Sequence, residues 1–214
     1  MCRETMTQVL ISGMKVTNTN EVIDQKVILG VDAVGVDKLA GECTACGKWA
    51  GSIASRLSTA NVFCRTEFYR EWRRKMWERS MYDAVFHLIG VVRSEPTTIS
   101  NVATYYSNEV SEIVWELSQL LRGWRAITLT YGFEERLLGF GESTGSEQGC
   151  ILPDELFPYI WGSPVFLESK KFVEYLNFAQ NEMKLIPGIT LPQRNDEDYI
   201  SKMRQGNLRA DGVV

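Results

Sequence analysis

The chain of 214 residues is 44% hydrophobic and 23% charged, and it carries a net charge of −4 at neutral pH. These values are ordinary for a folded globular protein, so the composition argues against intrinsic disorder. The negative charge argues against a protein whose whole surface neutralises phosphates, although a local basic patch is compatible with it.

The hydrophobic and cysteine patterns bear on the location of the protein. No run of about 18 uncharged apolar residues is present, so we expect no transmembrane helix. The first residues, MCRETMTQVLISG, include an early acid and no sustained apolar run, unlike a secretory signal. Five cysteines are an odd number and too few for a disulfide scaffold. We therefore expect reduced thiols and a cytoplasmic location, or one in a virus particle formed there.

The N-terminal 30 residues predict an arm or short strands. Residues 8–12 and 26–29 have the composition of strands, and the polar cluster 17–20 between them is typical of a turn.

Residues 39–57 predict the first helix. Apolar or thiol side chains recur there every three or four residues, which places them on one face of a helix. These residues are Leu39, Cys43, Cys46, Ala50, Ile53 and Leu57. Gly47 and Gly51 lie on a neighbouring face, where each weakens a helix by about 1 kcal/mol but allows another backbone to approach closely.

Two longer helices are predicted next. The first begins near Thr66, carries an apolar stripe from Phe68 to Val92 and ends before Pro96. The second begins after the N-cap candidates in residues 97–101. Its stripe is the most regular in the chain and consists of Tyr106, Val110, Ile113, Leu117, Leu120 and Trp124.

The remaining residues predict a mixture of elements. The alternating, β-branched residues 125–131 indicate a strand, residues 139–149 a glycine-rich loop, and residues 153–161 one short helix. A further helical stripe covers residues 172–186.

Together these elements predict a mainly α protein, a helical bundle of about four amphipathic helices with a small β element and extended termini. The predicted organisation is an N-terminal arm or short strands over 1–30, a helical core domain over 31–186 and a flexible C-terminal tail over 187–214.

Two patterns that attract attention as reactive sites are interpreted as core packing. Cys43 and Cys46 have the spacing of a redox or zinc motif, but a redox pair lies at a helix start and a zinc site needs two more ligands. Both fall on the apolar stripe, so core packing is favoured, with metal binding and redox chemistry as alternatives. His87, the only histidine, is expected to be a satisfied core or interface residue rather than a catalytic base.

No catalytic residue, metal or cofactor is predicted. The chain has no serine nucleophile elbow, and residues 139–149 lack the Gly-Lys-Ser/Thr of a phosphate-binding loop. Glu109, Glu112 and Glu116 share one flank of a predicted helix, without the histidine three residues later that metal sites in bundles use. We interpret them as a solvated or salt-bridged face.

Residues 65–79 are the strongest functional candidate. Basic residues contact phosphates, and aromatic residues interleaved with them offer stacking surfaces to unpaired bases. The predicted nucleic-acid-binding residues are Arg70, Arg73, Arg74, Lys75, Trp72, Trp77 and Arg122. The alternative is a solvated surface in which these cations pair with nearby acids.

Arg122 joins this set through a predicted antiparallel hairpin of the two long helices. A turn near residues 94–103 places residues 73–75 opposite Arg122, while Glu116 could reach Arg79. Most acids of the second long helix would then miss the basic cluster and leave it available to a partner.

These features favour a non-enzymatic structural or assembly protein that self-associates and contacts RNA or DNA, as a viral coat or nucleocapsid subunit in a virion does. The first alternative is a helical regulatory or adaptor protein that binds a protein partner through Phe157, Tyr159 and Trp161. The second is an enzyme with a dispersed site that includes Glu134, Glu135, Arg136 and the glycine-rich loop 139–149.

Overall fold

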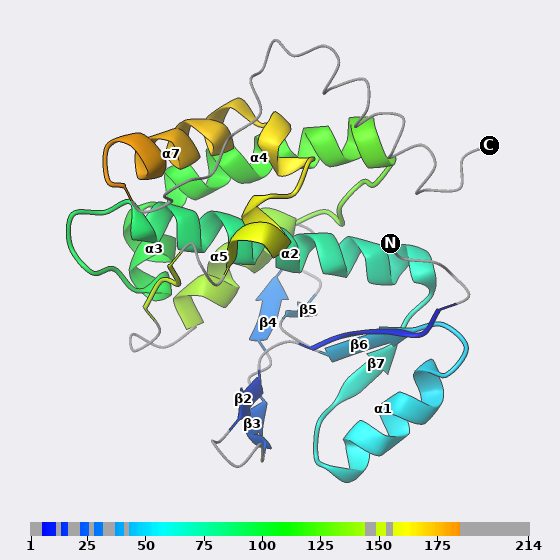
Figure 1. The fold of residues 1–214 in the computed structure, drawn as a ribbon. Helices are drawn as coiled ribbons and strands as arrows, with labels where there is room; N and C mark the ends of the chain where they lie inside the picture. Colours follow the sequence, from blue (N-terminus) through cyan, green and yellow to red (C-terminus); the bar gives the residue numbers. More distant parts are fainter. Residues whose placement is uncertain are drawn as a thin grey trace. The chain divides into compact units, whose positions relative to one another are not determined.

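The computed structural model of the chain describes residues 6–11, 14–16, 22–25, 28–31, 37–40, 43–143, 149–152 and 156–184. These residues are mainly helical with a small β component, as the sequence predicts (Figure 1). The chain divides into two compact units. Unit 1 is Met1–Glu78 with Leu129–Phe140, and unit 2 is Arg79–Thr128 with Gly141–Val214.

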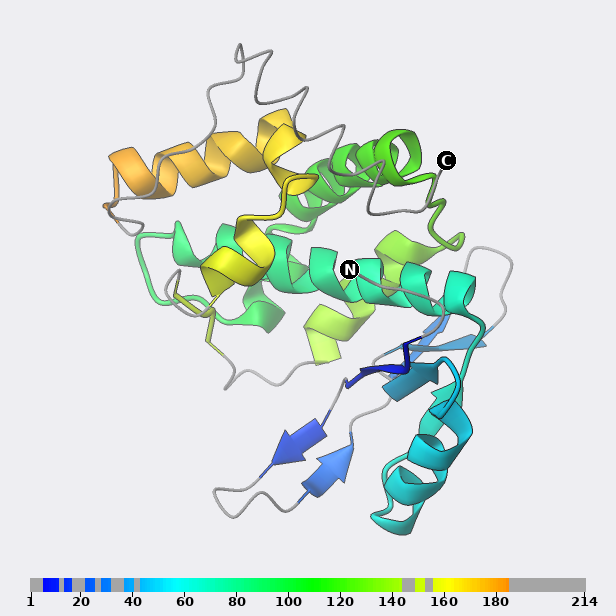
Figure 2. The same cartoon turned by 45° about the vertical axis from the view of Figure 1, so that its right-hand side comes forward.

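The centre of unit 1 is a three-stranded sheet in the order β1-β6-β7. Its strands are β1 (Gln8–Leu10), β6 (Cys43–Cys46) and β7 (Cys64–Thr66). β6 pairs antiparallel with β1 and parallel with β7. Parallel neighbours need a crossover connection, which here is helix α1 (Ala50–Thr59) packed against β6 and β7 (Figure 2).

Two antiparallel hairpins complete the described strands of unit 1. The first pairs β2 (Met14–Val16) with β3 (Val22–Gln25), and the second pairs β4 (Ile28–Val31) with β5 (Asp37–Ala40). Of the segments predicted as strands or an arm, residues 8–10 form β1 and residues 28–29 begin β4, while residues 12, 26 and 27 lie outside the described residues. The predicted turn at residues 17–20 lies outside the described residues.

The predicted helix over 39–57 is wrong in its first half. Strand β6 occupies residues 43–46, and α1 begins only at Ala50. All four residues of β6 are buried, so the strand is covered on both faces and needs small or apolar side chains at every position. A short run in which every residue is buried shows neither the strand nor the helix period. The spacing of Cys43 and Cys46 is therefore also compatible with one face of a helix.

Gly47 makes the turn between β6 and α1. Its φ is +98°, a conformation that glycine adopts without strain. A Cβ at this position would overlap the carbonyl oxygen of Met6 and lie 2.8 Å from the Cα of Thr7. The Thr7 hydroxyl oxygen accepts a hydrogen bond from the Trp49 amide at 3.0 Å, which fixes the turn against the start of β1.

Helix α2 (Tyr69–Val91) runs from unit 1 into unit 2. It begins three residues after the predicted start because Thr66 still pairs with Ala45 in the sheet. The Glu67 amide then donates to the Ala45 carbonyl at 2.8 Å, and the Phe68 carbonyl accepts the first helical bond, from Trp72. As predicted, the helix ends before Pro96.

In unit 2, the third predicted helix is divided. Thr98 caps α3 (Ile99–Tyr105) by accepting from the Asn101 amide, so the predicted N-cap region is confirmed. The helix is interrupted at Tyr106, and a second helix, α4 (Ser107–Arg125), follows directly. The buried face of α4 consists of Val110, Ile113, Val114, Leu117, Ser118 and Leu121.

The C-terminal part of unit 2 contains a π-helical turn η1 (Phe157–Trp161), a 3-10 turn η2 (Phe166–Glu168) and α7 (Lys170–Asn181). The predicted stripe of α7 is confirmed by the burial of Phe172, Leu176 and Ala179. Its continuation to residue 186 and the predicted tail, residues 187–214, lie outside the described residues.

Two predictions between α4 and η1 are wrong. Residues 126–130 form no strand, although Ile127 and Leu129 are buried and their neighbours are not. The alternation is real, but no described strand pairs with these residues, and Ala126 leaves α4 in a left-handed conformation. The first residues of the predicted loop 139–149 are helical, because α5 covers Phe133–Ser143. Within the described residues, no helix is long and apolar enough to cross a membrane.

We expect Gly47→Ala to lower the free energy of unfolding by about 1–3 kcal/mol, because alanine is strained at this φ and its Cβ meets the backbone of Met6 and Thr7, just before β1. Gly51→Ala is the matched control, since an added Cβ there meets nothing within 4 Å and alanine favours the helix by up to about 1 kcal/mol. Urea unfolding of both variants measures the difference. Equal stabilities of the two variants would contradict the assigned turn.

Candidate nucleic-acid interface

Positive charge is concentrated in residues 43–78 of unit 1. This segment contains seven lysines and arginines and three glutamates, a net charge of +4 in a chain whose net charge is −4. The segment includes β6, α1, β7 and the first turns of α2. A polyanion would therefore meet a different field here than over the chain as a whole.

Each glutamate of this segment is paired with one cation of unit 1. Glu67 accepts from Lys75 at 2.8 Å, and Glu71 pairs with Arg74 at 3.4 Å. Glu78 pairs with Arg136 at 2.6 Å. Lys75 and Arg74, two of the predicted phosphate-binding residues, are thus engaged in ion pairs within the unit.

Trp72 is not available for stacking, which corrects one part of the predicted site. Its side chain is only 4% exposed, and its indole N–H donates to the Thr44 carbonyl of β6 at 3.3 Å. Trp77, the second predicted stacking residue, is half-buried. The interleaving of basic and aromatic residues in the sequence therefore does not place these two rings on an open surface.

Phe68 is the exposed ring that the sequence reasoning missed. It is 87% exposed and immediately precedes α2. In the sequence it appeared as the first residue of an apolar stripe, because the helix was expected to begin near Thr66. With the helix beginning at Tyr69, Trp72 takes the buried position and Phe68 lies in solvent.

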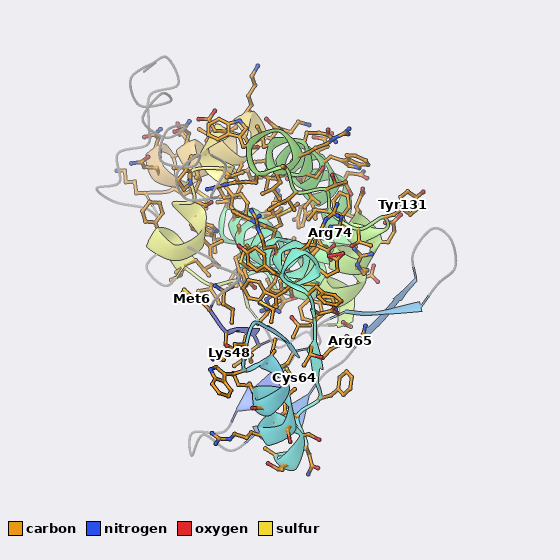
Figure 3. The ribbon with its side chains drawn as sticks, turned by 90° about the vertical axis from the view of Figure 1, so that its right-hand side faces the viewer. Met6, Lys48, Cys64, Arg65, Arg74 and Tyr131 are labelled. Carbon is orange, nitrogen blue, oxygen red and sulfur yellow. The ribbon has the colours of Figure 1, made fainter. Side chains whose placement is uncertain are left out.

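Three arginines lie close to Phe68 in the sequence. Arg70 is exposed, and within the described part of the chain no hydrogen bond or ion pair engages its side chain. Arg73 lies over the ring of Tyr69, with 5.6 Å between guanidinium and ring centre. Arg65 is exposed on β7, next to Cys64, and Figure 3 labels both with Arg74 of α2.

A second exposed ring lies in the turn before α1. Trp49 is 60% exposed, and the ammonium group of Lys48 lies 5.2 Å from the centre of one of its rings. The turn is held by Gly47 and by the Thr7 hydroxyl, so this ring is also carried on an ordered backbone. The sequence pattern gives no signal for this ring, because the predicted helix over 39–57 places Trp49 in the middle of a helix instead of in a turn.

We define the basic-aromatic surface of unit 1 by its exposed members: Lys48, Trp49, Arg65, Phe68 and Arg70.

Arg136 is a buried structural residue rather than part of an open catalytic site. It binds both carboxylate oxygens of Glu78 through its Nε and Nη2 atoms, at 3.3 and 2.6 Å. The same guanidinium donates to the carbonyls of Tyr131, at 2.7 Å, and Thr130, at 3.1 Å. Burial raises the pKa of Glu78, and the guanidinium of Arg136 opposes that rise.

Arg122 lies in unit 2, exposed in the last turn of α4. Residues 73–75 belong to unit 1, so the predicted position of Arg122 opposite them stays a prediction. The expected contact of Glu116 with Arg79 is wrong, because Arg79 pairs with Asp83 at 3.0 Å. Glu116 instead accepts from the backbone amides of Lys170 and Lys171 at the start of α7.

The other acids of this α4 face are also paired. Lys171 donates to Glu112 at 2.6 Å, while Arg93 and the Tyr175 hydroxyl both bind Glu109. Glu109 and Glu112 are therefore salt-bridged, as interpreted, whereas Glu116 binds the backbone at the start of α7.

Cys43 and Cys46 are buried free thiols of β6. They are core residues, as interpreted, although they belong to a strand and not to a helix. In the described part of the chain, no group of three or more His, Cys, Asp or Glu side chains could hold a metal ion.

His87 is a buried, hydrogen-bonded core residue, as predicted. Its Nδ1 accepts from the Ile151 amide at 2.7 Å, so the ring is neutral with the proton on Nε2. Burial, aided by the charge of Arg79, lowers the pKa of His87 to about 4.

No family model, curated protein or solved structure matches the chain.

His87 predicts an acid-sensitive stability. Its pKa is about 4 in the folded protein and 6.5 ordinarily, so the unfolded chain binds the proton more readily. The contribution of His87 to the free energy of unfolding should fall by about 1.4 kcal/mol per pH unit as the pH drops from 6.5 to 4, and it should be independent of pH above 6.5. Chemical unfolding at several pH values measures the slope.

His87→Asn is the control, because its Oδ1 takes the position of Nδ1, can accept the same bond and does not titrate in this range. A variant that retains the wild-type slope between pH 6.5 and 4 would rule out His87 as the source.

Proposed function

We propose that the protein is a non-enzymatic structural protein that binds nucleic acid through the basic-aromatic surface of unit 1. The observation that carries the proposal is Arg70, an exposed guanidinium with no described acidic partner, two residues from the exposed ring of Phe68. Cations of this kind contact phosphates, and rings of this kind contact bases.

The charge distribution supports the proposal. Residues 43–78 contain seven lysines and arginines against three glutamates, so the segment has an excess of four positive charges. The rest of the chain is acidic and would repel a polyanion. A nucleic acid would therefore be directed to this one surface instead of coating the protein.

The geometry gives less support to the alternatives. Trp161, the central anchor of the suggested adaptor surface, is 0% exposed, and its indole N–H donates to the Ala84 carbonyl at 2.9 Å. The side chain of Arg136, suggested for a dispersed catalytic site, is occupied by Glu78 and two backbone carbonyls.

Self-association is the second part of the proposal. Among the described residues of unit 2, four large apolar side chains are exposed: Tyr105, Trp115, Leu152 and Phe178. Burial of such side chains at about 25 cal/mol per Å² is the usual source of subunit affinity. Sedimentation and electron micrographs of the purified protein, with and without RNA, test this part. A strict monomer at high protein concentration would contradict it.

We expect Arg70→Gln to weaken binding of a labelled single-stranded oligonucleotide and to reduce its salt dependence. Each lost phosphate contact on a single strand lowers the slope of log affinity against log salt by about 0.7. Fluorescence anisotropy between about 50 and 200 mM salt measures both quantities. Because Arg70 is exposed, the variant should keep the wild-type melting temperature.

Lys170→Gln is the matched control, since it removes one exposed positive charge from unit 2. It should leave the affinity and the slope unchanged. Absence of wild-type binding at about 50 mM salt, or equal effects of the two substitutions, would overturn the proposal.

A further inference from the structure

We infer that Phe68 is a preorganised platform on which an unpaired base stacks, so that the ligand of the basic-aromatic surface is single-stranded nucleic acid. This inference rests on the proposed function and deepens it, because phosphate contacts alone do not distinguish single strands from duplexes.

Phe68 is the most exposed large apolar side chain in the described part of the chain. Single exposed apolar residues are common and need no explanation by themselves. The informative feature is the way in which the backbone around this one is held.

The residues on both sides of Phe68 are tied to strand β6. On one side, the Glu67 amide donates to the Ala45 carbonyl at 2.8 Å, and the Glu67 carboxylate pairs with Lys75. On the other side, Trp72 donates its amide to the Phe68 carbonyl at 2.9 Å and its indole N–H to Thr44 at 3.3 Å. The ring therefore projects from a fixed backbone position, which lowers the entropy lost when a ligand binds.

Lys75 acquires a different role from the predicted one. Its ammonium group binds the Glu67 carboxylate, so it positions the residue that precedes Phe68. A partly buried pair of this kind orders the segment without offering its charge to a phosphate.

Cations flank the ring along the chain. Arg65 and Arg70 are both exposed and bracket Phe68. Five residues span at most about 18 Å, so one short stretch of strand can contact both arginines and the ring.

Only an unpaired base can use this arrangement fully. In a duplex the faces of the bases are covered by their neighbours, so a duplex would engage the arginines and leave the ring in water. A single strand can place one base on the ring, a contact worth about 1–3 kcal/mol by substitution, for any of the four bases.

The test compares Phe68→Leu and Phe68→Trp with the wild type on a 12-nucleotide single strand and on a duplex of the same length. Phe68→Leu should lower single-strand affinity about 5- to 150-fold, with an unchanged salt slope and an unchanged duplex affinity. Phe68→Trp should retain the single-strand affinity. Tyr105→Leu, which removes an exposed ring from unit 2, is the matched control and should have no effect.

The possible results distinguish a failure of base stacking on Phe68 from a failure of nucleic-acid binding as a whole. Salt-dependent binding that is equal in wild type and Phe68→Leu, or a loss that is the same on the duplex, overturns the stacking role alone. Absence of wild-type binding to both probes overturns the proposed function and the inference together. Because Phe68 is exposed, equal melting temperatures of the variants confirm that folding is not the cause of any loss.

Discussion

The fixation of the first turns of α2 against strand β6 is the constraint on which the rest of unit 1 depends. The Trp72 indole donates to Thr44, and the Glu67 amide donates to the neighbouring carbonyl of Ala45. These two bonds set the rotation of the helix about its axis. Because one face is thereby buried, Phe68 and Arg70 are left in solvent.

Ion pairs with nearby glutamates determine which cations at the start of α2 are available to bind a phosphate. Lys75 and Arg74 are engaged by Glu67 and Glu71, so each stabilises the unit more than it attracts a polyanion. Partly exposed pairs of this kind contribute at most about 1 kcal/mol to stability. Their larger effect is to order the segment before Phe68 and to leave Arg70 without a described acidic partner.

The sequence predicted the class of fold and the helices with a clear 3.6-residue period, such as the stripe of Phe172, Leu176 and Ala179. The sequence did not predict the structure where pairing with strands distant in the chain determines it. Residues 43–46 became a strand because β1 and β7 cover both edges, and residues 126–130 did not because no described strand pairs with them. The sequence alone selects the segment of the proposed site, but choosing Phe68 over Trp72 requires the start of α2, which the pairing of β7 determines.

Photochemical cross-linking reports which residues touch a nucleic acid, so it tests directly whether the basic-aromatic surface of unit 1 is the binding site. A single-stranded oligonucleotide that contains 5-iodouridine would be irradiated with the full-length protein, and the cross-linked peptides identified by mass spectrometry. The account predicts cross-links at Phe68 and Trp49 of unit 1, competed away by salt. Cross-links confined to unit 2, for example beside Arg122 in α4, would contradict it.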